Sequence, residues 1–430
     1  MSAVVYDSAQ MNQPTAQTTP PPLFAQRPPV FTAAPHRMMF FGGVVQLVLT
    51  LLFWGAELLG RYVSGWMPPA TVIPATLAHA FLMPYALFPF FMFGFLMTTY
   101  PRWMNGIEIP RHRYTASFLL LAAGVVLYYL GLYFSKTIMT AGVTLLLAGW
   151  GGALRALFIV YRDAPATDKR TESVLNFALG AGWIGMLCYL LWLITGHPIL
   201  QNLSLQIGVW LFLVVVLVSV SHRMIPFFSS TVLDNYTVVR PTWTLPVLLA
   251  CVIGHVALAL TEFPQWLFVC DLPLALLGFY HTLRWKLLRS FKVRLLAVLH
   301  IAFLWWGIAM LLFSVQSLAL LIGGEPILGK APIHALGIGF VASMTLGMAT
   351  RVTLGHSGRP LVLDGFAWGC FLGVSITALL RIAAEIPLLP DSIGVSFNLL
   401  AAGAWLLFIG AWVLKFAPMY LRPRIDGKPG

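Results

Sequence analysis

The feature that most constrains this chain is a series of apolar runs that fills most of its length. Each run is about 20 residues long, which is enough for one helix to cross the hydrocarbon core of a bilayer. The runs are continuously apolar rather than alternating, and only helices or closed barrels satisfy backbone groups in lipid. The sequence therefore predicts an all-α, polytopic membrane helix bundle with about twelve transmembrane helices. The predicted spans are centred near Leu49, Leu87, Gly124, Leu147, Gly185, Leu213, Ile253, Leu276, Ala309, Val341, Gly373 and Leu406.

The composition leaves little of the chain for a soluble domain. Hydrophobic residues make up 59% of the chain and charged residues only 9%, whereas a soluble domain carries about 25% charged residues. Residues 1–36, rich in Pro, Gln and Thr, are predicted to be a disordered cytoplasmic tail. Residues 37–418 are predicted to form the transmembrane domain, and residues 419–430 a basic cytoplasmic tail.

Lys and Arg are unevenly divided between the two sets of connections. Because basic residues concentrate on the cytoplasmic side, the connections after even-numbered spans and both termini are predicted to be cytoplasmic. The basic residues that give the chain its net charge of +12 then line one face of the lipid bilayer. No nucleic-acid partner is expected. The odd-numbered connections hold Arg61, Lys136 and Lys330, whereas the even-numbered ones hold Arg102, Arg111, Arg113, Arg162, Lys169, Arg170, Arg223, Arg240, Arg284, Lys286, Arg289, Lys292, Arg294 and Arg359.

Two histidines are predicted to lie at the same depth in the outer leaflet. His79 follows the outer start of the second span, and His334 lies in the first turn of the tenth. If these helices are neighbours, the two imidazoles can ligate one iron from opposite sides as a bis-imidazole haem site. The small residues that follow His334 admit either a flat macrocycle or a closely packed helix. Met348 shares the face of His334 and is either a soft copper ligand or a filler of gaps between helices.

Two arginines lie at the same predicted depth as the outer histidines. Arg61 and Arg381 are placed where they could pair with haem propionates. The alternative is local pairing, of Arg61 with Glu57 and of Arg381 with Glu385.

A second group of histidines is predicted at the cytoplasmic side. His222, His300 and His356 end or begin separate spans, and three such imidazoles could form a copper site or a second haem site. His281 is predicted at the same depth, but a basic patch at the membrane interface is enough to explain a histidine there. His255 and Asp271 lie inside spans, where Asp271 could carry protons or orient a histidine. The remaining histidines are predicted to be solvated polar residues of the tail or loops: His36, His112 and His197.

Four segments of the chain resemble the NnrS family of bacterial inner-membrane proteins. They are HAFLMPYALFPFFMFGFLMTTYPRW, SHRMIPFF, VLHIAFLWWG and HALGIGFVASMTLGMATRVTLGHSGRPL, within a resemblance that runs from about residue 38 to residue 420. The resemblance implies b-type haem, copper as a second candidate metal, and a role in nitric oxide metabolism and nitrosative stress. The residues that match by position are His79, His300, His334, His356, Arg351 and Arg359.

The chain departs from the family pattern directly after the histidine of the second span. Many members carry a second histidine and a glutamate there, whereas this chain has Phe81 and Leu82. The arrangement is also similar to the core subunit of haem-copper oxidases, by analogy, although the paired histidines of that subunit's seventh and tenth spans are absent.

The sequence leaves three functions open. The first is a haem b or haem-copper protein that binds nitric oxide or processes iron-nitrosyl species, with His79 and His334 at the outer site and His300, His356 and His222 at the inner one. The second is a secondary transporter for a small solute, although only Pro84 and Pro89 clearly break a span. The third is a non-catalytic haem sensor. Whether the protein is an oxidoreductase, and from which donor it would take electrons, stays open.

Overall fold

The computed structural model describes residues 29–63, 65–386 and 389–428, and every regular element in these ranges is helical. The predicted tail up to residue 28 lies outside the described residues. The predicted all-α bundle is confirmed. The α-helices are α1 (Pro35–Tyr62), α2 (Ala75–Phe81), α3 (Phe88–Met104), α4 (Arg111–Phe134), α5 (Lys136–Asp163), α6 (Arg170–Thr195), α7 (Pro198–Gln206), α8 (Val215–Val232), α9 (Thr244–Ala259), α10 (Phe268–Arg284), α11 (Leu287–Ser290), α12 (Arg294–Gly323), α13 (Ala331–His334), α14 (Ser343–His356), α15 (Gly365–Ala383) and α16 (Asp391–Leu421).

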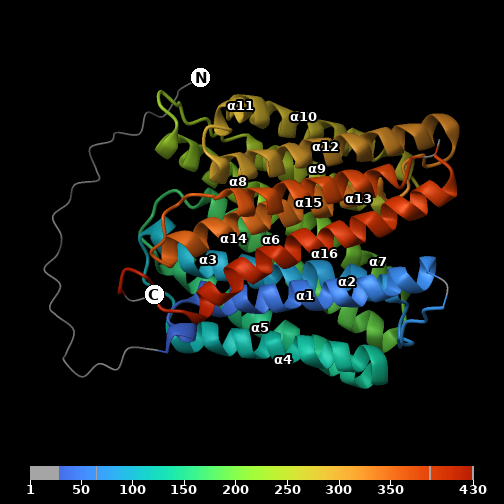
Figure 1. Cartoon of the computed structure of the whole chain (residues 1–430), viewed down its shortest axis with the longest axis horizontal. Helices are drawn as coiled ribbons and strands as arrows, with labels where there is room; N and C mark the ends of the chain where they lie inside the picture. The colour runs from blue at the N-terminus through green and yellow to red at the C-terminus, as the bar shows by residue number, and fades with distance from the viewer. Residues whose placement is uncertain (1–28, 64, 387–388, 429–430) are drawn as a thin grey trace, which may run out of the picture.

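Eleven helices or helix combinations in the described residues are long and apolar enough to cross a membrane. The remaining predicted span, the seventh, centred near Ile253, corresponds to α9, which has only 16 residues. The helices run side by side along the long axis of the bundle, and α1 begins at the same end at which α16 finishes (Figure 1). We call this the terminal end and the other the far end. The common position of the two ends agrees with the predicted even number of crossings.

Three spans contain a π-helical segment between two α-helices. These segments are η3 (Leu82–Leu87) between α2 and α3, η4 (Ile207–Val214) between α7 and α8, and η6 (Ala335–Ala342) between α13 and α14. Pro84 explains the first, because it lacks the N–H that an α-helix needs. With α9 counted as a span, the distorted spans are the second, sixth and tenth, so the distortion recurs at every fourth helix. Such distortions are frequent at functional sites.

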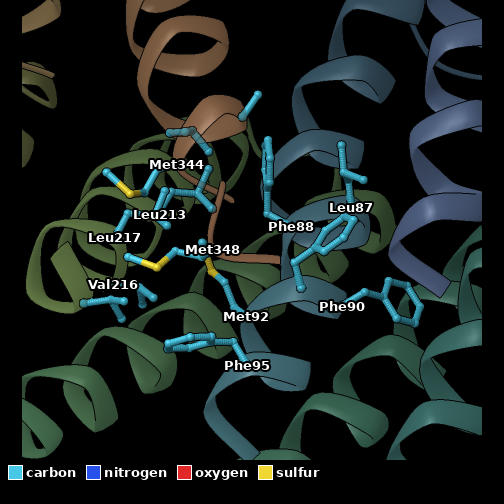
Figure 2. Close-up of a cluster of buried hydrophobic side chains, with 14 of the residues drawn as sticks. Leu87, Phe88, Phe90, Met92, Phe95, Leu213, Val216, Leu217, Met344 and Met348 are labelled. Atoms are coloured by element: carbon cyan, nitrogen blue, oxygen red, sulfur yellow. The ribbon is translucent and has the colours of Figure 1, made fainter. Parts of the chain in front are cut away.

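The three distorted spans meet in the interior of the bundle. Between 72% and 89% of their apolar windows is buried. They enclose an apolar cavity of about 30 Å³, to which α3 contributes Met92 and Phe95, α8 contributes Val216, and α14 contributes Met348 (Figure 2). The thioethers therefore lie among apolar side chains, as expected for methionines that fill gaps.

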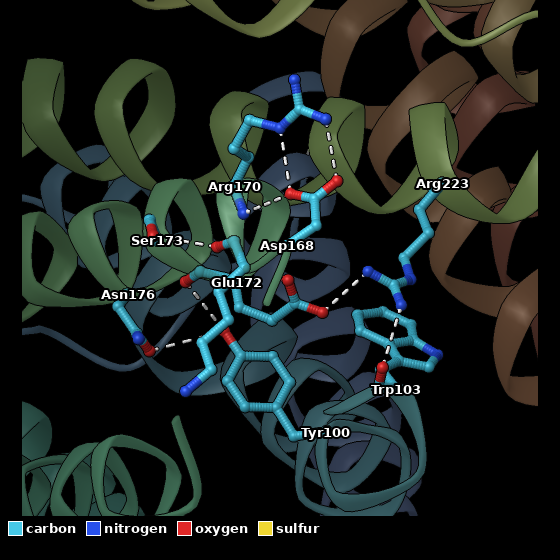
Figure 3. Close-up of polar contacts among 9 residues, drawn as sticks. Tyr100, Trp103, Asp168, Arg170, Glu172, Ser173, Asn176 and Arg223 are labelled. Atoms are coloured by element: carbon cyan, nitrogen blue, oxygen red, sulfur yellow. Dashed lines mark hydrogen bonds and ion pairs between the residues drawn. The ribbon is translucent and has the colours of Figure 1, made fainter. Parts of the chain in front are cut away.

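A buried ion pair joins three spans near the terminal end. Glu172 of α6 is fully buried, and its Oε1 accepts a hydrogen bond of 2.7 Å from Arg223 of α8 (Figure 3). The guanidinium of Arg223 also lies over the ring of Trp103 of α3, 4.5 Å from its centroid. Because a buried carboxylate needs such a partner, this contact fixes the relative positions of α3, α6 and α8. In the loop before α6, hydrogen bonds from Arg170 lower the pKa of Asp168 to about 2.

Candidate metal and cofactor sites

The structure brings the two outer histidines together at the far end of the bundle. His79 lies on α2 and His334 is the last residue of α13, and the two rings interact electrostatically. His334 Nδ1 donates a hydrogen bond of 2.8 Å to the carbonyl oxygen of Lys330, which leaves Nε2 as the nitrogen available to a ligand. His79 Nδ1 is buried and has no hydrogen-bond partner among the described residues. Both spans become π-helical within three residues of the histidine.

The surroundings of this pair fit a flat, anionic cofactor. A Cβ added at Gly337, three residues beyond His334, would meet nothing within 4 Å, so this half-buried position leaves room for a bound group. A Cβ at Gly339 would instead lie 2.6 Å from the ring of Trp305, so this second glycine serves close packing. The donor set of two neutral imidazoles is that of a low-spin haem.

The two predicted arginines also lie at this site. The charges of Arg61 and Arg381 both act on His79. Arg381 forms an ion pair of 2.7 Å with Glu385, as the local alternative predicted. Arg61 lies over the ring of Trp54, 4.9 Å from its centroid. Both guanidiniums therefore lie near His79 and already have partners within the protein.

The predicted inner histidines are divided among three places at the terminal end. His222 lies next to His281, His356 lies next to His36, and His300 shares a hydrogen bond of 3.1 Å with Ser229. The described residues contain no group of three or more His, Cys, Asp or Glu side chains arranged to hold a metal ion. The structure therefore does not bring His222, His300 and His356 together around one ion.

The pair formed by His222 and His281 includes an unsatisfied ring nitrogen. The ring centroids are 5.5 Å apart, and both side chains are buried. Nδ1 of His281 has no hydrogen-bond partner in the described part of the chain, whereas the ring of His222 lies within reach of the backbone carbonyl of Pro241. His281 Nε2 is 3.0 Å from Thr244 Oγ1, and the ring stacks on Trp285 at 4.6 Å. Buried polar atoms are normally satisfied, so this nitrogen marks a site that a ligand could complete.

The pair formed by His36 and His356 corrects one sequence prediction. His36 was expected to be a solvated tail residue, but it is only 2% exposed. The reason is that α1 begins at Pro35, a favourable first residue of a helix, so His36 lies in the packed first turn of α1. Its ring centroid is 4.6 Å from that of His356.

A family model described as NnrS protein matches residues 30–424 of the chain, which is nearly its whole length. The chain belongs to the NnrS family. A search of curated proteins gave no match. Family membership and the eleven apolar helices together support a membrane protein with a role related to nitric oxide.

The positions that resemble the NnrS pattern occupy both ends of the bundle. His79 and His334 form the outer pair, whereas His300 lies beside Ser229 at the terminal end. Arg351 lies over the ring of Phe228, 3.7 Å from its centroid, and so joins α14 to α8. This contact explains Arg351 as a packing residue between two of the distorted spans.

Another buried histidine is oriented by a carboxylate. His255 of α9 and Asp271 of α10 share a hydrogen bond of 2.6 Å between Nδ1 and Oδ1. The ring of His255 also lies 3.6 Å from that of Trp210 in η4. Asp271 thus orients a histidine, which is one of the two roles expected from the sequence. The same contact joins the short α9 to α10.

Proposed function

We propose that this NnrS-family chain is a haem b protein of the bacterial inner membrane that binds nitric oxide or processes iron-nitrosyl species. The observation that carries the proposal is the pair of half-buried imidazoles on separate spans, His79 and His334, beside Gly337, where a Cβ would meet nothing within 4 Å. Haem iron bound there would supply redox chemistry, and nitric oxide would reach the iron only in place of one of the two imidazoles.

The protein's own part in this site is to orient the ligands. The Lys330 carbonyl holds the tautomer of His334 in which Nε2 is free to coordinate. Trp54 stacks on His79 and limits rotation of its ring. Arg61 and Arg381 would pair with the propionates through charge-assisted hydrogen bonds.

A second metal site is proposed at the terminal end, between His222 and His281. Imidazoles suit copper, and the supporting observations are the adjacent buried rings and the Nδ1 of His281, which has no partner among the described residues. In this proposal His281 takes the place of His300 and His356 as the partner of His222. His300 lies beside Ser229, and His356 lies beside His36.

The orientation in the membrane follows the basic residues. The terminal end carries most of the Lys and Arg side chains of the connections, so we place it, with both termini, in the cytoplasm. The far end with the haem pair then faces the periplasmic half of the bilayer. An electron donor, which the sequence does not identify, would be needed for any turnover of nitric oxide.

The pattern of helix distortions favours this function over transport. Transporters made of two related halves break corresponding helices in each half, which for twelve spans would pair the second with the eighth. Here the distortions lie in the second, sixth and tenth spans. An Asp271→Asn variant that lost a solute flux, in protein without haem, would support the transporter instead.

The test is the haem content of purified protein and of three variants. We expect a Soret band and b-type haem in the wild type, and loss of most haem from His79→Ala and His334→Ala. His197→Ala, at an exposed loop histidine, is the matched control and should keep its haem. Wild-type protein without haem, after expression with haem supplied, would contradict the proposal. Consumption of nitric oxide by the reduced protein in a single turnover would separate an enzyme from a sensor.

A further inference from the structure

Four chain segments converge around the rings of His36 and His356 at the terminal end. His36 lies in the first turn of α1, and His356 is the last residue of α14. The end of α3 contributes Thr98, whose Oγ1 is 3.5 Å from His36 Nδ1. The segment that follows α16 supplies Arg424, which donates a hydrogen bond of 3.3 Å to the carbonyl oxygen of His356. In Figure 1 the start of α1 and the end of α16 lie at the same end of the bundle.

Arg37 is positioned by two contacts that leave one of its donors free. Arg37 is only 2% exposed, and its Nη1 donates to the carbonyl oxygens of Tyr420 at 3.3 Å and Arg422 at 2.8 Å. Its Nε is buried and has no partner among the described residues. Arg102, at the end of α3, is exposed. The cluster therefore joins a buried guanidinium to one that solvent can reach.

The charge around the two rings is strongly positive. The charges of Arg37, Arg102 and Arg424 act on both histidines, and no carboxylate of the described residues is among the groups that do so. The nearest acid, Asp426, is held by Arg424 through two hydrogen bonds of 2.8 and 2.6 Å. The positive end of the α1 dipole lies at the same place, together with the negative ends of the α3 and α14 dipoles. Three guanidiniums thus face one carboxylate.

We propose that this cluster, formed by His36, His356, Arg37, Arg102 and Arg424, binds a phosphate-type oxyanion. Guanidinium groups match the geometry of phosphate oxygens, and neutral imidazoles and the Arg37 Nε add further donors. A metal ion is disfavoured because it would add positive charge beside three guanidiniums, and Asp426, the nearest carboxylate, is already bonded to Arg424. At the end of a membrane bundle, two sources offer this chemistry: inorganic phosphate and the head group of an anionic phospholipid.

This site is separate from the proposed haem site and does not depend on it. His356 is 22 residues beyond His334 on one continuous span, which corresponds to roughly 33 Å along a helix. Variants in the cluster should therefore leave the absorption spectrum of a haem bound at the far end unchanged.

The experiment measures phosphate and lipid binding to the full-length, cofactor-loaded protein in phosphatidylcholine nanodiscs. Inorganic phosphate is titrated in one arm, and the retention of added phosphatidylglycerol is measured by native mass spectrometry in the other. The variants are His356→Gln and Arg102→Gln; the latter changes an exposed side chain, so its fold should survive. Arg284→Gln, at an exposed arginine of α10, is the control.

The expected result is that the affinity for one of the two probes falls about tenfold or more in both variants but not in the control. Loss of phosphate binding assigns the site to the free anion, and loss of phosphatidylglycerol alone assigns it to a head group. Equal binding by the wild type and both variants would overturn the proposal. Loss of a haem or of a bound metal ion from His356→Gln and from His36→Gln would overturn it as well, in favour of a metal site.

Discussion

Trp54 lies flat against His79, with ring centroids 4.2 Å apart and planes only 15° from parallel. The guanidinium of Arg61 lies over the same indole, 4.9 Å from the ring centroid. One side chain of α1 therefore positions both an expected iron ligand and an expected partner of a propionate. This arrangement makes Trp54 a positioning residue of the proposed haem site, although sequence analysis did not single it out.

Replacing Trp54 should weaken haem binding without removing either ligand. Loss of a stacked aromatic pair costs about 0.5–1.5 kcal/mol, so we expect Trp54→Ala to bind haem roughly 2–10-fold more weakly. Titration of the haem-free protein with haemin measures this, and electron paramagnetic resonance reports the altered orientation of the ligand rings. Trp54→Phe should restore most of the affinity. Trp66→Phe, at an exposed tryptophan of the same end, is the control, and a Trp54→Ala variant that matched it in both measurements would rule out the positioning role.

The terminal-end metal can be assigned by comparing three histidines. His222→Ala and His281→Ala should each lose most of the bound copper, because each removes one of two ligands. His300→Ala should keep it, because the ring of His300 shares its hydrogen bond with Ser229 and no ring contact joins it to the pair in the described structure. Elemental analysis of the purified proteins checks both statements. Copper lost from His300→Ala but kept in His281→Ala would restore the grouping expected from sequence.

The depth of each histidine could be predicted from sequence, but not all of its neighbours. Hydropathy and the positions of Lys and Arg are local properties, so they placed His79 and His334 in one layer, and the structure brings these two together. His222, His300 and His356 also share a layer, yet the packing of helices assigns each to a different neighbour. Which spans touch is a tertiary property that residue spacing does not contain.

The distorted spans show the same division between local and tertiary information. Pro84 predicted the break in the second span, because a proline removes a backbone hydrogen-bond donor wherever it lies. The π-helical segments η4 and η6 contain no proline, so only the packing of the bundle reveals them. His36 was misjudged for a related reason: the apolar run that follows it gave no sign that the helix began as early as Pro35.

Breaking the buried ion pair of Figure 3 should destabilise the bundle strongly. Arg223→Met leaves the buried Glu172 carboxylate without its partner, for which we expect a loss of about 3–5 kcal/mol in the free energy of unfolding. The double variant Glu172→Leu, Arg223→Met removes both charges and should recover most of that loss. Unfolding in detergent followed by circular dichroism measures the difference. Arg162→Met breaks the exposed pair with Asp163 and should change stability by less than about 1 kcal/mol. A single Arg223→Met variant as stable as this control would show that the pair does not hold α6 to α8.

Two glycines provide a matched test of helix packing in the membrane. A Cβ at Gly131 of α4 would lie 2.1 Å from the backbone nitrogen of Met139 in α5, a contact that the backbone cannot relieve by a side-chain rotation. We therefore expect Gly131→Ala to cost about 1–3 kcal/mol through forced separation of the two helices. Gly403 of α16 is exposed, and a Cβ there would meet nothing within 4 Å. Gly403→Ala should be neutral or add up to about 1 kcal/mol, because alanine favours a helix over glycine. Thermal unfolding of both variants in the same detergent measures the contrast, and equal stabilities would mean that α4 and α5 are not packed backbone to backbone.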